Sequence, residues 1–183
     1  DGAHKSRWIY LPENQKIDTS DVDNWVFPVG TQFFKEFRKP NPKAGHPKEI
    51  KVETRHLYKY REGVGKEVWQ VATYLWNDSQ TEASLLKEGK ANVLGTNHDI
   101  PSNQDCVDCH KGNRDFILGF ESLQLSEAQH EFAYGHGPKR QPGELDLALV
   151  KQLRFLSHPM ASPTLPGNET EQKMLGYLHA NCG

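Results

Sequence analysis

Two runs rich in β-branched and aromatic residues, at positions 50–60 and 67–76, most constrain what this chain can fold into. Alternate residues of each run fall on one face of an extended strand. The segment between them, residues 62–66, supplies two glycines for a hairpin turn. Residues 7–11 and 32–37 have the same strand-forming composition. The sequence therefore predicts a β-rich N-terminal portion with at least four strands.

The overall composition is that of a globular protein and argues against two classes of partner. Of the 183 residues, 36% are hydrophobic and 25% are charged, which is enough apolar material for a buried core. The formal charge of -2 gives no basic surface for nucleic acid. No uninterrupted apolar run approaches the roughly 18 residues of a membrane-spanning helix. We therefore expect no nucleic-acid partner and no membrane partner.

The second half of the chain has the spacing of helices. Leucines recur at helical intervals in residues 144–156, and a weaker pattern covers residues 118–129. Residues 173–181 have the length and composition of a closing helix. The predicted fold class is α+β, with a β-rich portion over residues 1–95 packed on an α-helical portion over residues 96–183 as one integrated unit.

The chemically most specific feature is the motif Cys-Val-Asp-Cys-His, formed by Cys106, Cys109 and His110 with two residues between the cysteines. Cys-x-x-Cys-His is the attachment sequence for c-type haem. Two thiols three positions apart on a helical turn can each form a thioether with one vinyl group of the same porphyrin, and the next imidazole can bind the iron. The alternatives are a redox dithiol and half of a zinc site. The remaining cysteine, Cys182, has no near partner in sequence with which to complete a zinc site. The motif therefore predicts haem c, with its iron, as the cofactor.

The motif and its surroundings resemble the c-type cytochromes. In the compact single-haem members, the motif is followed by helices and loops, a proline-flanked methionine and a closing helix. The corresponding parts here are residues 106–110, about 116–156, Met160 and 169–181. The resemblance implies a cytochrome c-like fold for the second portion. The chain departs from the family at residues 97–101, where a proline interrupts the expected long helix, so the β-rich portion is expected to cover that flank.

More particularly, the segments RWIYLP, WVFPVGT, TYLWN and HDIPS are similar to those of a group of secreted bacterial haem-c proteins. Members often carry several haems, and some are joined to carbohydrate-binding modules in polysaccharide-degrading bacteria. The resemblance implies electron transfer in the periplasm or outside the cell, with a redox protein such as a secreted oxidoreductase as partner. A haem-c enzyme, such as a peroxidase or the haem subunit of a dehydrogenase, is the alternative. In that group YLHANCG leads into a second motif, so Cys182 is expected to supply the first thioether of a second haem.

The sixth position on the iron decides between electron transfer and ligand binding. Met160 lies in a proline-stiffened loop before the closing helix, where compact cytochromes place their methionine. The resemblance therefore favours Met160 as the sixth ligand opposite His110. His98, in the HDIPS segment, is the leading alternative, and His136 and His158 are weaker candidates.

A haem also requires an apolar wall and partners for its propionates. The apolar residues expected to form the wall are Ile117, Leu118, Phe120, Leu123, Phe155 and Leu165. The cations considered for the propionates are Lys111, Arg114 and Arg140, for each of which an ordinary solvated charge is the alternative.

Overall fold

The computed structural model describes residues 2–43, 47–126 and 143–182. Contacts divide the chain into two compact units. Unit 1 contains Asp1–Glu13 and Pro28–Gly112, and unit 2 contains Asn14–Phe27 and Asn113–Gly183. The Cys-Val-Asp-Cys-His motif belongs to unit 1. The contacts group residues 96–112 with the sheet of unit 1. The division expected between residues 95 and 96 stays a prediction.

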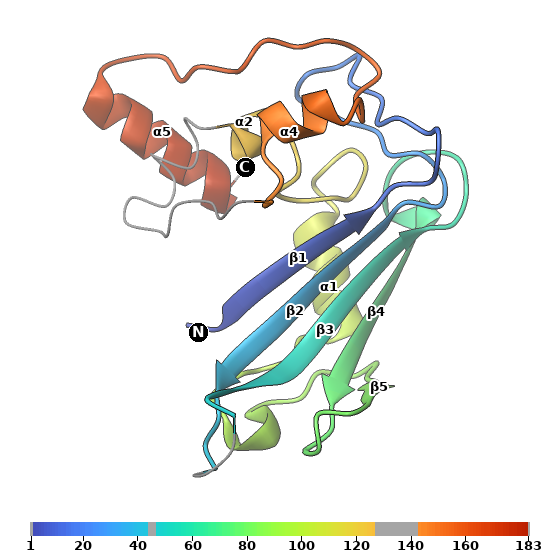
Figure 1. Ribbon diagram of the computed structural model, residues 1–183, viewed down its shortest axis with the longest axis vertical. Coiled ribbons are helices and arrows are strands. Elements are labelled where there is room, and N and C mark those ends of the chain that lie inside the picture. The colour runs from blue at the N-terminus through green and yellow to red at the C-terminus, as the bar shows by residue number, and fades with distance from the viewer. Residues whose placement is uncertain (1, 44–46, 127–142, 183) are drawn as a thin grey trace. The chain divides into compact units, whose positions relative to one another are not determined.

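Unit 1 is built on a five-stranded antiparallel sheet whose strands follow one another in sequence order (Figure 1). The strands are β1 (His4–Tyr10), β2 (Gln32–Pro40), β3 (Glu49–Lys59), β4 (Trp69–Trp76) and β5 (Ala83–Leu85). The first four confirm the strands expected from the sequence, and the three-residue β5 adds an edge strand that no expectation covered. In the β3–β4 turn, Gly63 and Gly65 have φ values of 113° and 83°, a region that glycine adopts without strain.

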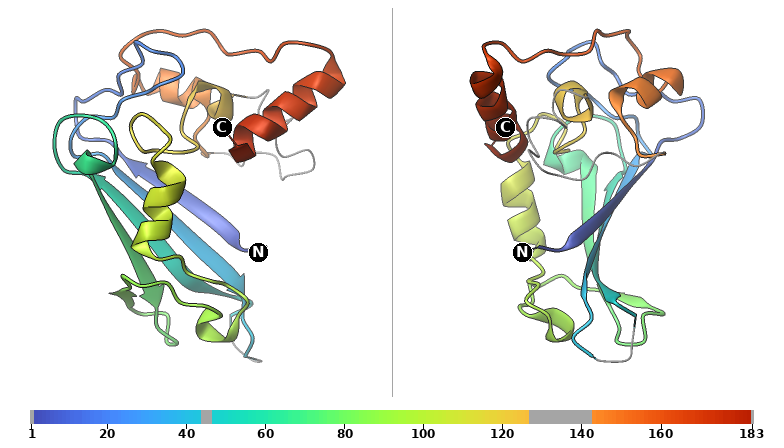
Figure 2. Two further views of the ribbon diagram at one scale, coloured as in Figure 1. Left: turned by 180° about the vertical axis from the view of Figure 1, so that it is seen from behind. Right: turned by 60° about the vertical axis from the view of Figure 1, so that its left-hand side comes forward.

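One face of this sheet carries the helix α1 (Asn103–His110), which packs against β4 (Figure 2). The core beneath is formed by residues of β2, of β3 and of the segment that leads into α1. They are Phe37, Ile50, Val52, Val93 and Ile100. Val93 belongs to the short 3₁₀ helix η2 (Val93–Gly95). The motif helix therefore lies on the sheet, on the same face as this core.

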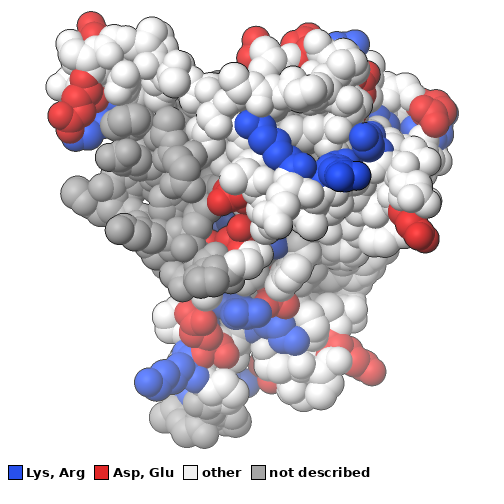
Figure 3. Space-filling view, turned by 45° about the horizontal axis from the view of Figure 1, so that its top comes forward, with Lys and Arg blue, Asp and Glu red and all other residues white. Residues whose placement is uncertain are grey.

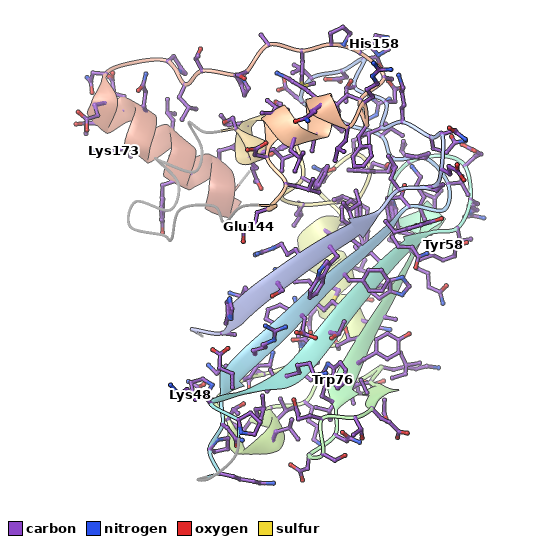
Figure 4. All side chains as sticks on the ribbon, viewed as in Figure 1. Lys48, Tyr58, Trp76, Glu144, His158 and Lys173 are labelled. Carbon is purple, nitrogen blue, oxygen red and sulfur yellow. The ribbon has the colours of Figure 1, made fainter. Side chains whose placement is uncertain are left out.

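The opposite face of the sheet carries exposed aromatic side chains. Trp8 and Tyr10 of β1 are 50% and 53% exposed. The rings of Phe34 and His56 stack with their centres 4.5 Å apart. Tyr58 of β3 continues this series along its strand, as the side-chain view shows (Figure 4). This face thus differs in character from the one that α1 covers.

Unit 2 contains the short helices α2 (Ser122–Leu125) and α4 (Leu147–Gln152) and the longer helix α5 (Glu169–Cys182). An isolated parallel bridge joins Ile17 to Leu156. The ring of Phe120 meets those of Trp25 and Phe27 edge-on. The backbone N–H of Phe27 donates to the buried Asp115 carboxylate at 2.7 Å. Extended segments therefore contribute to the core of this unit as much as helices do.

The expected α-helical, cytochrome c-like second portion is wrong. The structure is a five-stranded antiparallel sheet with few helices. The leucine pattern of residues 144–156 forms only the six-residue α4, because Asp146 caps its start and Arg154, with a left-handed φ of 58°, ends it. The motif helix packs on β4 rather than in a bundle of helices. The closing helix was correctly expected: α5 covers Glu169–Cys182, where the resemblance placed it over residues 169–181.

Two further properties concern the surface and the membrane. The face drawn in Figure 3 carries both basic and acidic side chains. None of the helices in the described part of the chain combines the length and the apolar character that crossing a bilayer demands.

Candidate functional site

The helix α1 carries all three motif residues and begins at a complete cap. The Ser102 hydroxyl accepts a hydrogen bond from the Asp105 backbone N–H at 3.2 Å, and the Asp105 carboxylate accepts one from the Ser102 backbone N–H at 2.9 Å. This reciprocal pair satisfies two backbone donors of the first turn. The same hydrogen bonds lower the pKa of Asp105 and so favour its charged form. This negative charge lies in the first turn of α1, at the positive end of the helix dipole. A short helix is thereby fixed at its start.

The spacing of the motif places its three reactive side chains on one side of α1. Residues three and four apart on a helix are neighbours on its surface. Cys109 is three residues and His110 four residues after Cys106. The three side chains are therefore neighbours on the surface of α1.

The two thiols have different environments. Cys106 is 8% exposed, whereas Cys109 is exposed to solvent. Burial raises the pKa of the Cys106 thiol, although the positive charge of Arg55 and the hydroxyl of Thr73 oppose this shift. Thr73 and Arg55 belong to β4 and β3, so Cys106 faces the sheet. In the folded chain Cys106 is the less reactive of the two thiols, because the thiolate is the nucleophilic form.

Strand register arranges the covered face of the sheet into rows of side chains. Arg7 pairs with Lys35, Lys35 with Arg55, and Arg55 with Thr73. The next row toward the β3–β4 turn is entirely apolar. It consists of Ile9, Phe33, Leu57 and Val71. The row of three cations, Arg7, Lys35 and Arg55, which we call the cation row, thus ends at Thr73 beside Cys106.

A partly buried lysine lies in the middle of the cation row. Lys35 Nζ is 5.1 Å and Arg55 Cζ is 4.6 Å from the centre of the Phe37 ring, and Lys5 Nζ approaches the same ring at 5.8 Å. These contacts are cation–π interactions. Burial, and then the charges of Arg7, Arg55 and Lys5, lower the pKa of Lys35 to about 8. Burial first, and then the neighbouring positive charges, therefore weaken proton binding by Lys35.

The carboxylate of this face, Glu53, is held by two partners. Its Oε2 lies 2.7 Å from His98 Nε2, and it forms an ion pair with Arg55. Glu53 and His98 are both inaccessible to solvent. Iron ligation through Nε2 would break this hydrogen bond and leave Glu53 with Arg55 alone. The geometry therefore assigns His98 a structural role, and its selection as the alternative sixth ligand stays a prediction.

The favoured sixth ligand belongs to the other unit. Met160 is half-buried in the extended segment before α5 in unit 2, while His110 is half-buried at the end of α1 in unit 1. Their pairing on one iron stays a prediction. His158, the weaker candidate, is exposed and its Nδ1 lies 2.8 Å from the Ser157 hydroxyl. His136 lies outside the described residues.

The remaining expectations for the haem surroundings are spread over both units. Lys111 pairs with Asp108 at 2.9 Å, and Arg114 lies 3.7 Å from Asp21, so each already has a carboxylate partner. Arg140 lies outside the described residues. The expected wall residues belong to unit 2, where Ile117 is buried and Leu118 is exposed. The helix α5 ends at Cys182, and the thioether role of that cysteine stays a prediction.

The cation row was not predicted from the sequence. The available signal was a basic residue at alternate positions of predicted strands, as in Lys5 and Arg7 of β1. Alternation alone does not pair strands, because a shift of one residue moves every side chain to the other face. The row becomes visible only with the register of β1, β2 and β3.

The donor set of α1 fits a haem c better than a zinc ion. The helix offers two thiols and one imidazole at the required spacing, next to an apolar row of the sheet. No cluster of three or more histidine, cysteine or acidic side chains placed to hold a metal ion occurs among residues 2–43, 47–126 and 143–182. Comparison with family models, with curated proteins and with solved structures gave no significant match, so the functional assignment rests on these residues.

Proposed function

We propose that this chain carries one covalently attached haem c and serves in electron transfer. The observation that carries the proposal is the placement of Cys106, Cys109 and His110 on one side of a capped helix that lies against a sheet. No disulfide or metal cluster competes for these side chains among the described residues. The proposal keeps the cofactor expected from the motif and discards the helical fold expected for it.

Each motif residue has a distinct part in holding the haem. Cys106 and Cys109 form the two thioether links, and His110 Nε2 or Nδ1 binds the iron. The apolar row of Ile9, Phe33, Leu57 and Val71 excludes water from the side of the site that faces the sheet. When bound, the haem supplies a one-electron redox centre whose potential depends on the axial ligands and on nearby charge.

The proposed setting follows from the covalent attachment. Cysteines destined for thioether links must be reduced when the haem is joined, and bacteria perform this step outside the cytoplasm. We therefore place the protein in the periplasm or outside the cell. The proposed partner is a redox protein, such as a secreted oxidoreductase, with which the haem exchanges electrons.

Intact-mass measurement after expression in a host with cytochrome maturation tests the proposal. The wild-type chain should have the mass of the polypeptide plus one haem after denaturation, and a pyridine haemochrome assay should count one haem. Cys106→Ser and Cys109→Ser should each weaken or abolish attachment. Cys182→Ser, the matched control, should leave the haem count at one. A wild-type mass without haem, with both motif thiols free, would refute the proposal and favour a redox dithiol.

A further inference from the structure

The cation row opposes the stability of the sheet that contains it. Arg7, Lys35 and Arg55 face one another directly across three neighbouring strands. Like charges directly opposite on a sheet are destabilising. Lys35 is also half-buried, which adds a desolvation cost to the repulsion. Such an arrangement calls for an anion that compensates both.

Nearby carboxylates of this unit already have partners. Glu53 forms its ion pair with Arg55 and its hydrogen bond with His98. On α1, Asp105 accepts from Ser102 and Asp108 from Lys111. Among the described residues of the two rows and the adjacent Phe37 row, Glu53 is the one acidic side chain. Three aligned cations therefore exceed the negative charge that unit 1 places beside them.

The position of the row relative to the motif limits what the anion can be. Arg55 is close enough to Cys106 to affect the pKa of its thiol, and the row ends at Thr73 beside that cysteine. The apolar row lies directly along one side of the cation row. A ligand joined to Cys106 would thus meet an apolar surface and a line of cations together. A porphyrin has this character, because its macrocycle is apolar and its two propionates are carboxylates.

We propose that Arg7, Lys35 and Arg55 form the carboxylate-binding part of the haem site and pair with the porphyrin propionates. This inference rests on the proposed attachment of haem at α1. It moves this role from Lys111 and Arg114, which pair with Asp108 and Asp21, to the sheet. Because Arg55 already pairs with Glu53, Arg7 and Lys35 carry most of the role. Arginine suits the role because its guanidinium can donate two parallel hydrogen bonds to one carboxylate. The cations come from the sheet rather than from the segment that follows the motif.

The test measures the reduction potential of the holoprotein as a function of pH. Wild type is compared with Arg7→Gln, Lys35→Met and the control Lys48→Met, which removes an exposed lysine from the same unit. A cation within about 4–6 Å lowers a carboxyl pKa by roughly 1–3 units. Loss of Arg7 or Lys35 should therefore raise the proton affinity of the haem carboxylates about tenfold and move the proton-linked step of the profile up by about one pH unit. The curve of reduction potential against pH for Lys48→Met should coincide with that of wild type.

Arg7→Gln is the decisive variant, because arginine does not titrate and its loss removes no proton-linked step of its own. Arg7 is exposed in β1, so the variant should still fold. A profile of Arg7→Gln that coincides with wild type, at one haem per chain, overturns the inference and leaves the proposed function intact. A wild type without haem overturns both, and the haem count separates the two failures.

A second arm separates the porphyrin from a free carboxylate as the source of the anion. The chain with Cys106→Ser and Cys109→Ser is unfolded thermally with and without succinate, with and without Arg7→Gln. Stabilisation by succinate that depends on Arg7, together with unchanged potential profiles, would identify a free dicarboxylate as the ligand and overturn the assignment to the porphyrin.

Discussion

His98 Nε2 lies 2.7 Å from Glu53 Oε2, and the two side chains are 1% and 0% exposed. The pair ties the segment before α1 to β3, and the His98 ring also contacts Phe37 with centres 5.2 Å apart. The histidine that the HDIPS resemblance offered as an iron ligand is thus built into the packing beneath the motif helix.

The first prediction concerns this pair. His98→Ala should lower the free energy of unfolding by about 3–5 kcal/mol, because it leaves a buried carboxylate with one partner fewer. The oxidised absorption spectrum of the holoprotein should be unchanged if His98 stays bonded to Glu53, as the structure has it, and does not bind the iron. Urea unfolding and absorption spectroscopy measure the two effects. His4→Ala, at an exposed histidine, is the control, and a changed spectrum in His98→Ala alone would restore His98 as ligand.

The second prediction concerns the thiols of the haem-free chain. Cys109 should react with iodoacetamide at least ~10-fold faster than Cys106, because Cys106 is buried and its pKa is raised. Peptide mass mapping after timed alkylation measures both rates. In urea the two rates should become similar. Equal rates in the native chain would mean that Cys106 does not face the sheet.

The third prediction tests the sixth ligand. Met160→Leu conserves volume and removes the sulfur, so the oxidised spectrum should change and the reduction potential should fall, or the iron should become open to small ligands. Met174→Leu provides a matched control at a methionine that is 64% exposed. If both variants keep the wild-type spectrum, the sixth ligand is a different residue.

The fourth prediction follows from Lys35, whose pKa is lowered to about 8 by burial. In the haem-free chain the unfolded state binds more protons than the folded state between about pH 8 and 10.5, so stability should rise with pH in this range. Lys35→Met should be more stable than wild type at pH 7, by about 1–3 kcal/mol after allowance for partial exposure. This difference in the free energy of unfolding should shrink above pH 8.

Urea unfolding at pH 7, 8.5 and 10 measures this difference, with Lys48→Met as the control for loss of a lysine charge. If the difference in the free energy of unfolding between Lys35→Met and wild type stays constant over this pH range, the lowered pKa of Lys35 is contradicted.

The sequence predicted the strands well and the helices poorly, for identifiable reasons. Residues 50–60 and 67–76 show the two-residue alternation of strands, and the segment between them has the glycines of a hairpin turn. These residues alone were enough to locate β3 and β4. The leucines of residues 144–156 imitate a longer helix than α4, because periodicity does not reveal that Arg154 takes a left-handed conformation. The closing helix was located because it is the one long periodic segment without interruption.

The candidate site divides in the same way. The motif could be recognised from the sequence, because Cys106, Cys109 and His110 lie within five consecutive positions. The cation row could not be recognised from the sequence, because Arg7, Lys35 and Arg55 are far apart along the chain. Only the strand register brings them together. The role of Glu53 as the partner of His98 was likewise hidden, since the two residues are 45 positions apart.

The division of the chain into units has a consequence for how such a protein can be inherited or engineered. The polypeptide passes from one unit to the other three times, after Glu13, after Phe27 and after Gly112. Neither unit is a contiguous segment, so no single cut yields either one whole, and no single insertion transplants it. A gene fusion that carries the motif helix together with its complete sheet must also carry residues 14–27, which belong to the other unit and form an isolated bridge to Leu156 there. Recombination would therefore preserve the pair as one heritable block, and shuffled variants should break either before β1 or after α5.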